Sequence, residues 1–103
     1  MFDVLIIGGG AAGVSCALVL GSAHKKTFVQ DKKIGILTHQ RGGNLQDALL
    51  NNVYGIPYGK SGSEVMLESL EHLRNVYPHI EQIPNEKVVT VARFSNYYQV
   101  HTN

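Results

Sequence analysis

The residues best suited to chemistry in this chain are the glycines in GGGAAG, Gly8 to Gly13. In the pattern Gly-x-Gly-x-x-Gly, the first glycine allows a tight turn and the second lets the backbone approach a pyrophosphate. The third lets a following helix pack closely on the preceding strand. Amides at the start of that helix, here those of Ala11 and Ala12, donate to phosphate oxygens, and the helix dipole favours the anion. The pattern therefore predicts a dinucleotide diphosphate over Gly8–Gly13.

The flanking sequence predicts the elements that must position these glycines. Residues 4–7, VLII, form a short apolar run that is typical of a buried parallel strand. Apolar residues at helical spacing predict a helix over 11–20, with Cys16 facing the sheet as a buried structural thiol. A second strand is predicted over 27–31, which places Asp31 at its carboxyl end. A carboxylate there can accept both hydroxyls of an adenosine ribose and repel a 2′-phosphate.

The rest of the chain completes a partial three-layer α/β fold of Rossmann type, in which residues 1–103 form the N-terminal part of one domain. Ser61 and Glu64 have capping-box spacing, and Met66, Leu70, Leu73 and Tyr77 share one helical face. The remaining predicted elements are a loop-rich stretch over 32–60 with one helical turn at 45–50, a helix from Ser61 to Pro78, a parallel strand over 80–83, and an antiparallel hairpin over 87–102.

Composition argues against several classes of function. The chain has 103 residues and a formal charge of +1, without the basic stripe that nucleic-acid binding needs. Its apolar runs of four to five residues are well short of the ~20 that cross a bilayer. A cytoplasmic protein without nucleic-acid or membrane partners is expected. The single cysteine allows neither an intramolecular disulfide nor a Cys-x-x-Cys pair, and the histidine spacing suggests no metal site. We expect no catalytic residue within these 103 positions.

Several segments together resemble the start of a low-molecular-weight thioredoxin reductase. They are DVLIIGGGAAG, RGGNL, NNVYGIP, SGSEVMLESL and KVVTVARFSNYYQVHT. In that family GGGxAG, GGQL, ENxPG, a G-x-E-L helix start and a β-meander follow one another in the same order. The resemblance spans essentially the whole chain, which corresponds to about the first third of such an enzyme. In the family this first fingerprint binds FAD, and a second Rossmann domain, expected only in a full-length parent, binds NADPH.

The resemblance also implies individual cofactor contacts. Gly43 and Leu45 match the glycine and leucine of GGQL, near the ribityl chain, and Asn52 matches the asparagine of ENxPG, near the isoalloxazine. Val88 falls near the place where the backbone meets adenine, and Asp31 would hold the ribose. The candidate FAD-binding residues are Gly8, Gly9, Gly10, Ala11, Ala12, Gly13, Asp31, Lys32, Gly43, Leu45, Asn52 and Val88.

Three functions remain open from the sequence. The first is the FAD-binding portion of an NAD(P)H-dependent flavin oxidoreductase, with this chain alone inactive. The second is a non-catalytic module that holds an adenine nucleotide. The third is a truncated fragment that associates with itself. As in the family that it resembles, a homodimer is expected.

Overall fold

A three-stranded parallel sheet forms the centre of the molecule. The computed structural model describes residues 1–39 and 45–103, and its parallel sheet has the order β1-β2-β5. The strands are β1 (Val4–Ile7), β2 (Ile34–Leu37) and β5 (Ile80–Ile83). As the central strand, β2 is buried along its whole length. The parallel strands predicted near 3–7 and 80–83 are confirmed.

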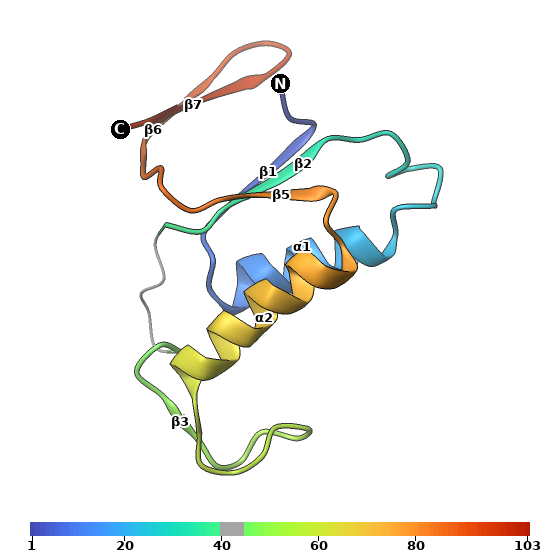
Figure 1. Ribbon diagram of the computed structural model, residues 1–103. Helices are drawn as coiled ribbons and strands as arrows, with labels where there is room; N and C mark the ends of the chain where they lie inside the picture. Colours follow the sequence, from blue (N-terminus) through green and yellow to red (C-terminus); the bar gives the residue numbers. More distant parts are fainter. Residues whose placement is uncertain (40–44) are drawn as a thin grey trace.

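Two helices cover one face of this sheet, and a hairpin lies on its other side (Figure 1). Ala17 of the first helix, Leu73 of the second and Ile36 of β2 are fully buried where the helices meet the sheet. The predicted three-layer α/β fold is therefore confirmed. The remaining elements are helices α1 (Ala11–Ser22) and α2 (Gly62–Val76), the short pair β3 (Leu49–Leu50) and β4 (Lys60–Ser61), and the hairpin β6 (Val88–Arg93) and β7 (Tyr98–Thr102).

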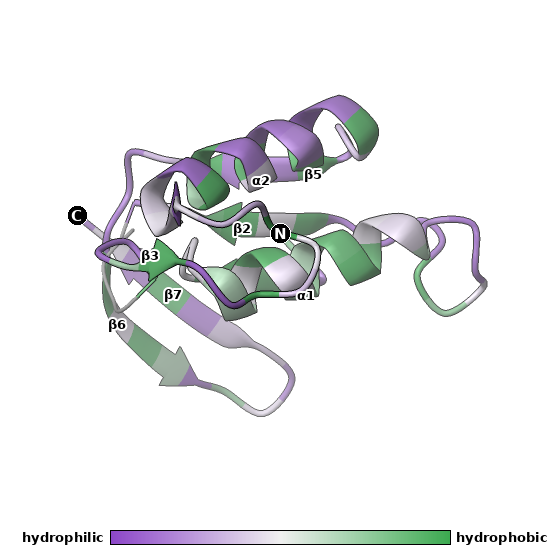
Figure 2. Cartoon of the chain, turned by 90° about the horizontal axis from the view of Figure 1, so that it is seen from below, coloured by the Kyte–Doolittle hydropathy of each residue, from purple (hydrophilic) through white to green (hydrophobic). Residues whose placement is uncertain are grey.

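Helix α2 forms as its sequence predicts. The hydroxyl of Ser61 accepts a hydrogen bond from the backbone N–H of Glu64 at 3.2 Å and so caps the helix. Met66, Leu70 and Leu73 are buried, while hydrophilic residues line the outer side of the helix (Figure 2). An amphipathic helix has one stable orientation on a sheet, which explains why its buried face was predictable.

Helix α1 buries a different face from the one predicted. Its buried residues are Val14, Ala17 and Gly21, whereas Cys16 is exposed and Val19 is 67% exposed. The prediction of a buried Cys16 is therefore wrong. Because α1 is apolar or neutral on nearly all sides (Figure 2), hydrophobic periodicity does not select the face that meets the sheet.

The second strand was predicted too early in the chain. Residues 27–31 form turns, and the strand that pairs with β1 begins at Ile34. In these turns the N–H of Gln30 donates to the Lys26 carbonyl at 2.7 Å, and the N–H of Lys32 donates to the Val29 carbonyl at 3.0 Å. Backbone groups engaged in such local bonds are not available for a sheet ladder.

The conformation of Asp31 is consistent with a turn rather than a strand end. Its φ of +65° is left-handed, a conformation that aspartate tolerates better than most residues. The predicted helical turn over 45–50 is also wrong, since a hydrogen-bonded turn at Leu45 leads directly into β3. The hairpin predicted over 87–102 is confirmed by the antiparallel pairing of β6 and β7. Among the described residues, no helix has both the length and the apolar character that crossing a membrane requires.

The two helices are held together where they end. A Cβ added to Gly21 of α1 would lie 2.6 Å from the ring of Tyr77, so Tyr77 packs directly on the glycine. The same region contains His24 and His79. Burial, and then the positive charge of His24, lower the pKa of His79 below its usual value.

Candidate cofactor site

The glycine turn between β1 and α1 has the geometry that the fingerprint requires. Gly8 has a φ of +114°, a conformation that is readily available only to glycine. Its N–H donates to the Leu37 carbonyl at 3.0 Å, which ties the turn to β2. A Cβ on Gly13 would overlap the carbonyl oxygen of Gly8. Gly13 therefore must be glycine for the helix to pack against the turn.

Gly10 is open toward solvent and begins the helix without a side-chain cap. A Cβ added there would meet no atom of residues 1–39 or 45–103 within 4 Å. The first hydrogen bond of the helix runs from Val14 N–H to the Gly10 carbonyl, so the helix does not use the amides of Ala11, Ala12 and Gly13. The first turn contains no acidic side chain. The helix start therefore offers free donors and a positive dipole end to an anion.

A hollow continues from this turn across the carboxyl edge of the sheet. It brings together Gly8 and Val88, two predicted site residues that lie far apart in the sequence. Such an edge is where ligands bind in open α/β sheets. The residues that line the hollow are Ile7, Gly8, Leu37, His39, Glu86, Lys87 and Val88.

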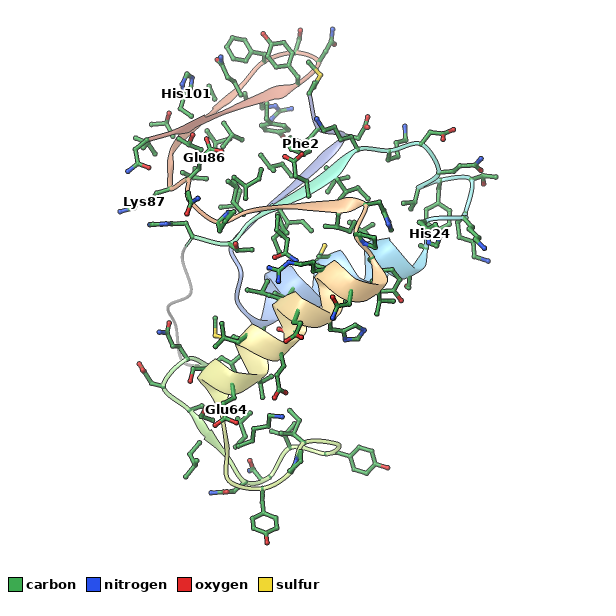
Figure 3. The ribbon with its side chains drawn as sticks, viewed as in Figure 1. Phe2, His24, Glu64, Glu86, Lys87 and His101 are labelled. Atoms are coloured by element: carbon green, nitrogen blue, oxygen red, sulfur yellow. The ribbon has the colours of Figure 1, made fainter. Side chains whose placement is uncertain are left out.

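Three polar residues of this hollow were not predicted, namely His39, Glu86 and Lys87. Glu86 accepts a hydrogen bond from the Thr102 hydroxyl at 2.6 Å, which orients its carboxylate. Figure 3 shows Glu86 and Lys87 next to each other where the chain passes from β5 to β6. The only sequence signal for them is position, since His39 follows β2 and the other two follow β5. A second hollow, beside β5 and the end of α2, is lined by Arg74, Pro78, Ile80, Glu81 and Gln82, none of which belongs to the glycine turn.

Asp31, Lys32, Leu45 and Asn52 do not line this hollow. Asp31 and Lys32 precede β2 and so lie toward its amino end, whereas the glycine turn follows the carboxyl end of β1. Ile7 pairs with Leu37 in the parallel register, so these two ends lie on opposite edges of the sheet. The placement of Asp31 at the carboxyl end of the second strand is therefore wrong, because the turns over 27–31 delay the strand.

The end of β2 instead presents Thr38 and His39. Thr38 is buried, and its N–H donates to the Ile83 carbonyl at 3.0 Å. Leu45 is half-buried against Gly62, while Asn52 is exposed in the loop between β3 and β4. Gly43 lies outside the described residues. The roles of Leu45, Asn52 and Gly43 at the flavin end of the cofactor stay predictions.

Comparison with known proteins identifies the family. The family described as FAD binding domain matches residues 3–57, which is more than half of the chain. The chain belongs to the FAD binding domain family. FAD is therefore its cofactor, as the sequence predicted. A search of curated proteins finds no match.

Solved structures resemble this FAD-binding chain over nearly its whole length. An oxidoreductase from Agrobacterium tumefaciens is 26% identical with a TM-score of 0.76, and covers 99% of this chain and 31% of its own. A thioredoxin reductase from Streptococcus pyogenes MGAS5005 is 27% identical with a TM-score of 0.76, over 99% and 30%. The thioredoxin reductase from Lactococcus lactis, 23% identical with a TM-score of 0.77 over 99% and 31%, shares the fold. The predicted resemblance is confirmed, and the chain spans about a third of the length of these proteins.

The residues at the glycine turn fit the diphosphate of FAD. Gly10 leaves open space beside three amides that the helix does not use. The adjoining hollow reaches Val88, where the adenine was expected. An extended dinucleotide requires such continuity between a phosphate cradle and a cleft at the sheet edge.

Proposed function

We propose that this chain is the FAD-binding portion of an NAD(P)H-dependent flavin oxidoreductase similar to thioredoxin reductase. The observation that carries the proposal is the glycine turn, with free amides and an open Gly10, at the mouth of the hollow along the sheet edge. FAD supplies the redox chemistry when it is bound, by accepting and releasing a hydride. The contribution of this chain is to bind and orient the adenosine diphosphate half.

Each side of the site has a distinct part in this proposal. The amides of Ala11, Ala12 and Gly13 donate to the pyrophosphate, and the dipole of α1 offsets its negative charge. The apolar residues Leu37 and Val88 line the hollow and would face the adenine. Lys87, in the same hollow, adds a positive charge close to the diphosphate.

The use of a nicotinamide coenzyme and the nature of the electron acceptor are proposals about the whole protein and not about this chain alone. Support for a thioredoxin-reductase-like reaction comes from the fold, which two solved thioredoxin reductases share over 99% of this chain. The chain has a single cysteine, Cys16, which is exposed. Relay of electrons to a disulfide needs a pair of thiols, so the proposal requires cysteines from outside residues 1–103.

The proposal includes a homodimer in the cytoplasm. An exposed free thiol at Cys16 suits a reducing compartment. The outer strand β1 has exposed apolar residues at Val4 and Ile7, and an unpaired strand edge favours association. Light scattering of the purified chain at several concentrations tests this part, and a monomer at all concentrations would contradict the dimer.

Titration of FAD into the chain, followed by flavin fluorescence, tests the proposed site. Gly10→Val fills the open space, so we expect at least about a tenfold loss of affinity, since 1.4 kcal/mol corresponds to tenfold. Ser22→Val is the matched control, because Ser22 is exposed at the other end of α1. Unchanged affinity in Gly10→Val would overturn the placement of the pyrophosphate.

A further inference from the structure

Two histidines that are distant in the sequence lie side by side where the two helices end. His24 follows α1 and His79 precedes β5. Their ring centroids are 5.1 Å apart, with 45° between the ring planes. We propose that His24 and His79 together bind a divalent late transition-metal ion such as Zn²⁺, at a site separate from the FAD site.

The spacing of the rings is the spacing that chelation requires. Zn–N bonds of about 2.0–2.1 Å and a tetrahedral angle place the centres of two chelating imidazoles about 5 Å apart. The observed distance of 5.1 Å between the ring centroids matches this value. The two rings are tilted by 45° and are not stacked in parallel.

A hydrogen bond made by Nδ1 of His24 leaves Nε2 of the same ring as the nitrogen that can bind a metal ion. Its Nδ1 lies 3.1 Å from the Gly21 carbonyl oxygen, which can only accept, so this nitrogen carries the proton. The neutral ring then keeps its lone pair on Nε2. Metal-binding histidines usually donate their other ring N–H to a carbonyl or carboxylate in this way, which fixes the orientation of the ring.

Both histidines are exposed, but packing at the helix ends fixes the backbone segments that carry them. Tyr77 lies directly on Gly21, and these two residues are close in the sequence to His79 and His24 respectively. The Tyr77 N–H donates to the Leu73 carbonyl at 2.9 Å, and the Tyr77 carbonyl accepts from the Ile80 N–H at 3.1 Å. Ligands mounted on such fixed segments lose little freedom when a metal binds.

The local field favours a cation. Helices α1 and α2 run in the same direction, so both present their carbonyl ends near this site (Figure 1). Each end carries about half a negative charge. Lys25, Lys26 and Arg74 act against a cation, but all three are exposed, and water and salt screen their charges.

The site has open coordination positions and lies away from the cofactor hollow. The described residues contain no cluster of three histidine, cysteine or acidic side chains, so water or an external ligand would complete a tetrahedral shell. Figure 3 shows His24 at the far end of the molecule from Glu86 and Lys87. Sequence spacing did not reveal the pair because its members come from different elements, and only the fold brings them together.

Zinc titration of the full chain carrying Cys16→Ser tests the site, since this substitution removes the exposed thiol. We expect the imidazole NMR signals of His24 and His79 to shift together, at lower ZnCl₂ than those of His39, His72 and His101. Loss of an outer-shell partner weakens metal binding about 10–100-fold, and loss of a ligand weakens it no less. His24→Gln and His79→Gln should therefore each lower the affinity measured by calorimetry at least about tenfold.

The double variant separates chelation from independent binding. If the two rings share one ion, each single variant already loses the chelated site, so His24→Gln/His79→Gln should add only a small further loss, whereas independent sites would leave one intact site in each single variant. His101→Gln is the control, because His101 is exposed on β7, and it should leave the affinity unchanged. Circular dichroism reports whether each variant is folded. If a variant failed to fold, the chain with both histidines present would still test the proposal. Shifts of the His24 and His79 NMR signals at different ZnCl₂ concentrations in that chain would overturn it.

Discussion

Glycine is favoured at positions 10 and 13 for opposite physical reasons. Gly10 faces open space, whereas a Cβ on Gly13 would overlap the Gly8 carbonyl oxygen. We expect Gly13→Ala to lower the free energy of unfolding by about 1–3 kcal/mol or more, as overpacking does. Gly10→Ala should lower it by about 1 kcal/mol or less, the difference between glycine and alanine at an N-cap. Urea denaturation of both variants measures this contrast, and equal losses would contradict it.

The carboxyl end of β2 lacks the acidic side chain that usually holds an adenosine ribose. His39 stands there, in the cofactor hollow, while Asp31 lies toward the opposite edge of the sheet. We expect His39→Asp to tighten FAD binding by up to about tenfold, because a hydrogen bond to a charged group contributes about 1.5–3 kcal/mol before solvent screening. Asp31→Asn should leave the affinity unchanged. Fluorescence titration compares the two, and a loss in Asp31→Asn alone would contradict this view of the site.

At the residue scale, the sequence identified site residues whose role arises within one short segment. It missed residues that only the folded sheet brings together. Gly8 to Gly13 were predictable because the turn, the free amides and the helix packing all arise within one short segment. His39 and Lys87 were not, since they share a hollow only after β2 and β5 have paired. The predicted placement of Asp31 at the carboxyl end of a strand was wrong, because hydrogen-bonded turns over 27–31 move that strand to a later position in the chain.

At the scale of elements, the contrast between the two helices shows when a pattern is informative. Helix α2 alternates apolar and charged residues, so only one face can be buried, and Met66, Leu70 and Leu73 were found. Helix α1 is apolar on nearly all sides, so tight packing of its small residues decides its orientation. Ala17 and Gly21 allow close approach, which leaves Cys16 outside. Composition does not reveal such a choice.

The cap of α2 provides a test at this scale. Ser61→Ala removes the hydroxyl that accepts from the Glu64 N–H, so we expect the free energy of unfolding to fall by about 0.5–2 kcal/mol. The matched control is Ser69→Ala in the same helix, where the Ser69 hydroxyl donates to the Met66 carbonyl. Alanine is a better helix former than serine, so this change should be neutral or slightly stabilising. Equal destabilisation in chemical denaturation would argue against the cap.

At the scale of the whole molecule, the helices and the parallel sheet form one core, while the hairpin β6–β7 lies apart from it. Val89, Val91 and Tyr98 of the hairpin are more than half exposed. The related solved structures are about three times as long, since this chain spans 30% or 31% of their length. Gly8, Leu37 and Val88 line one hollow at the carboxyl edge of the sheet, where we propose that the adenosine half of FAD binds.

The last prediction concerns catalysis by residues 1–103 alone. Hydride transfer needs a nicotinamide held against the flavin, and reduction of a disulfide needs two thiols within reach. This chain has one Gly-x-Gly-x-x-Gly turn, which the diphosphate of FAD would occupy, and one cysteine, Cys16. We therefore expect weak FAD binding without NADPH-driven reduction of a disulfide substrate. The measurement is NADPH oxidation with FAD and the disulfide, against a blank that contains free FAD only. Turnover above this blank that Gly10→Val abolishes would show that the 103 residues hold both nucleotides, because free flavin would be insensitive to the variant.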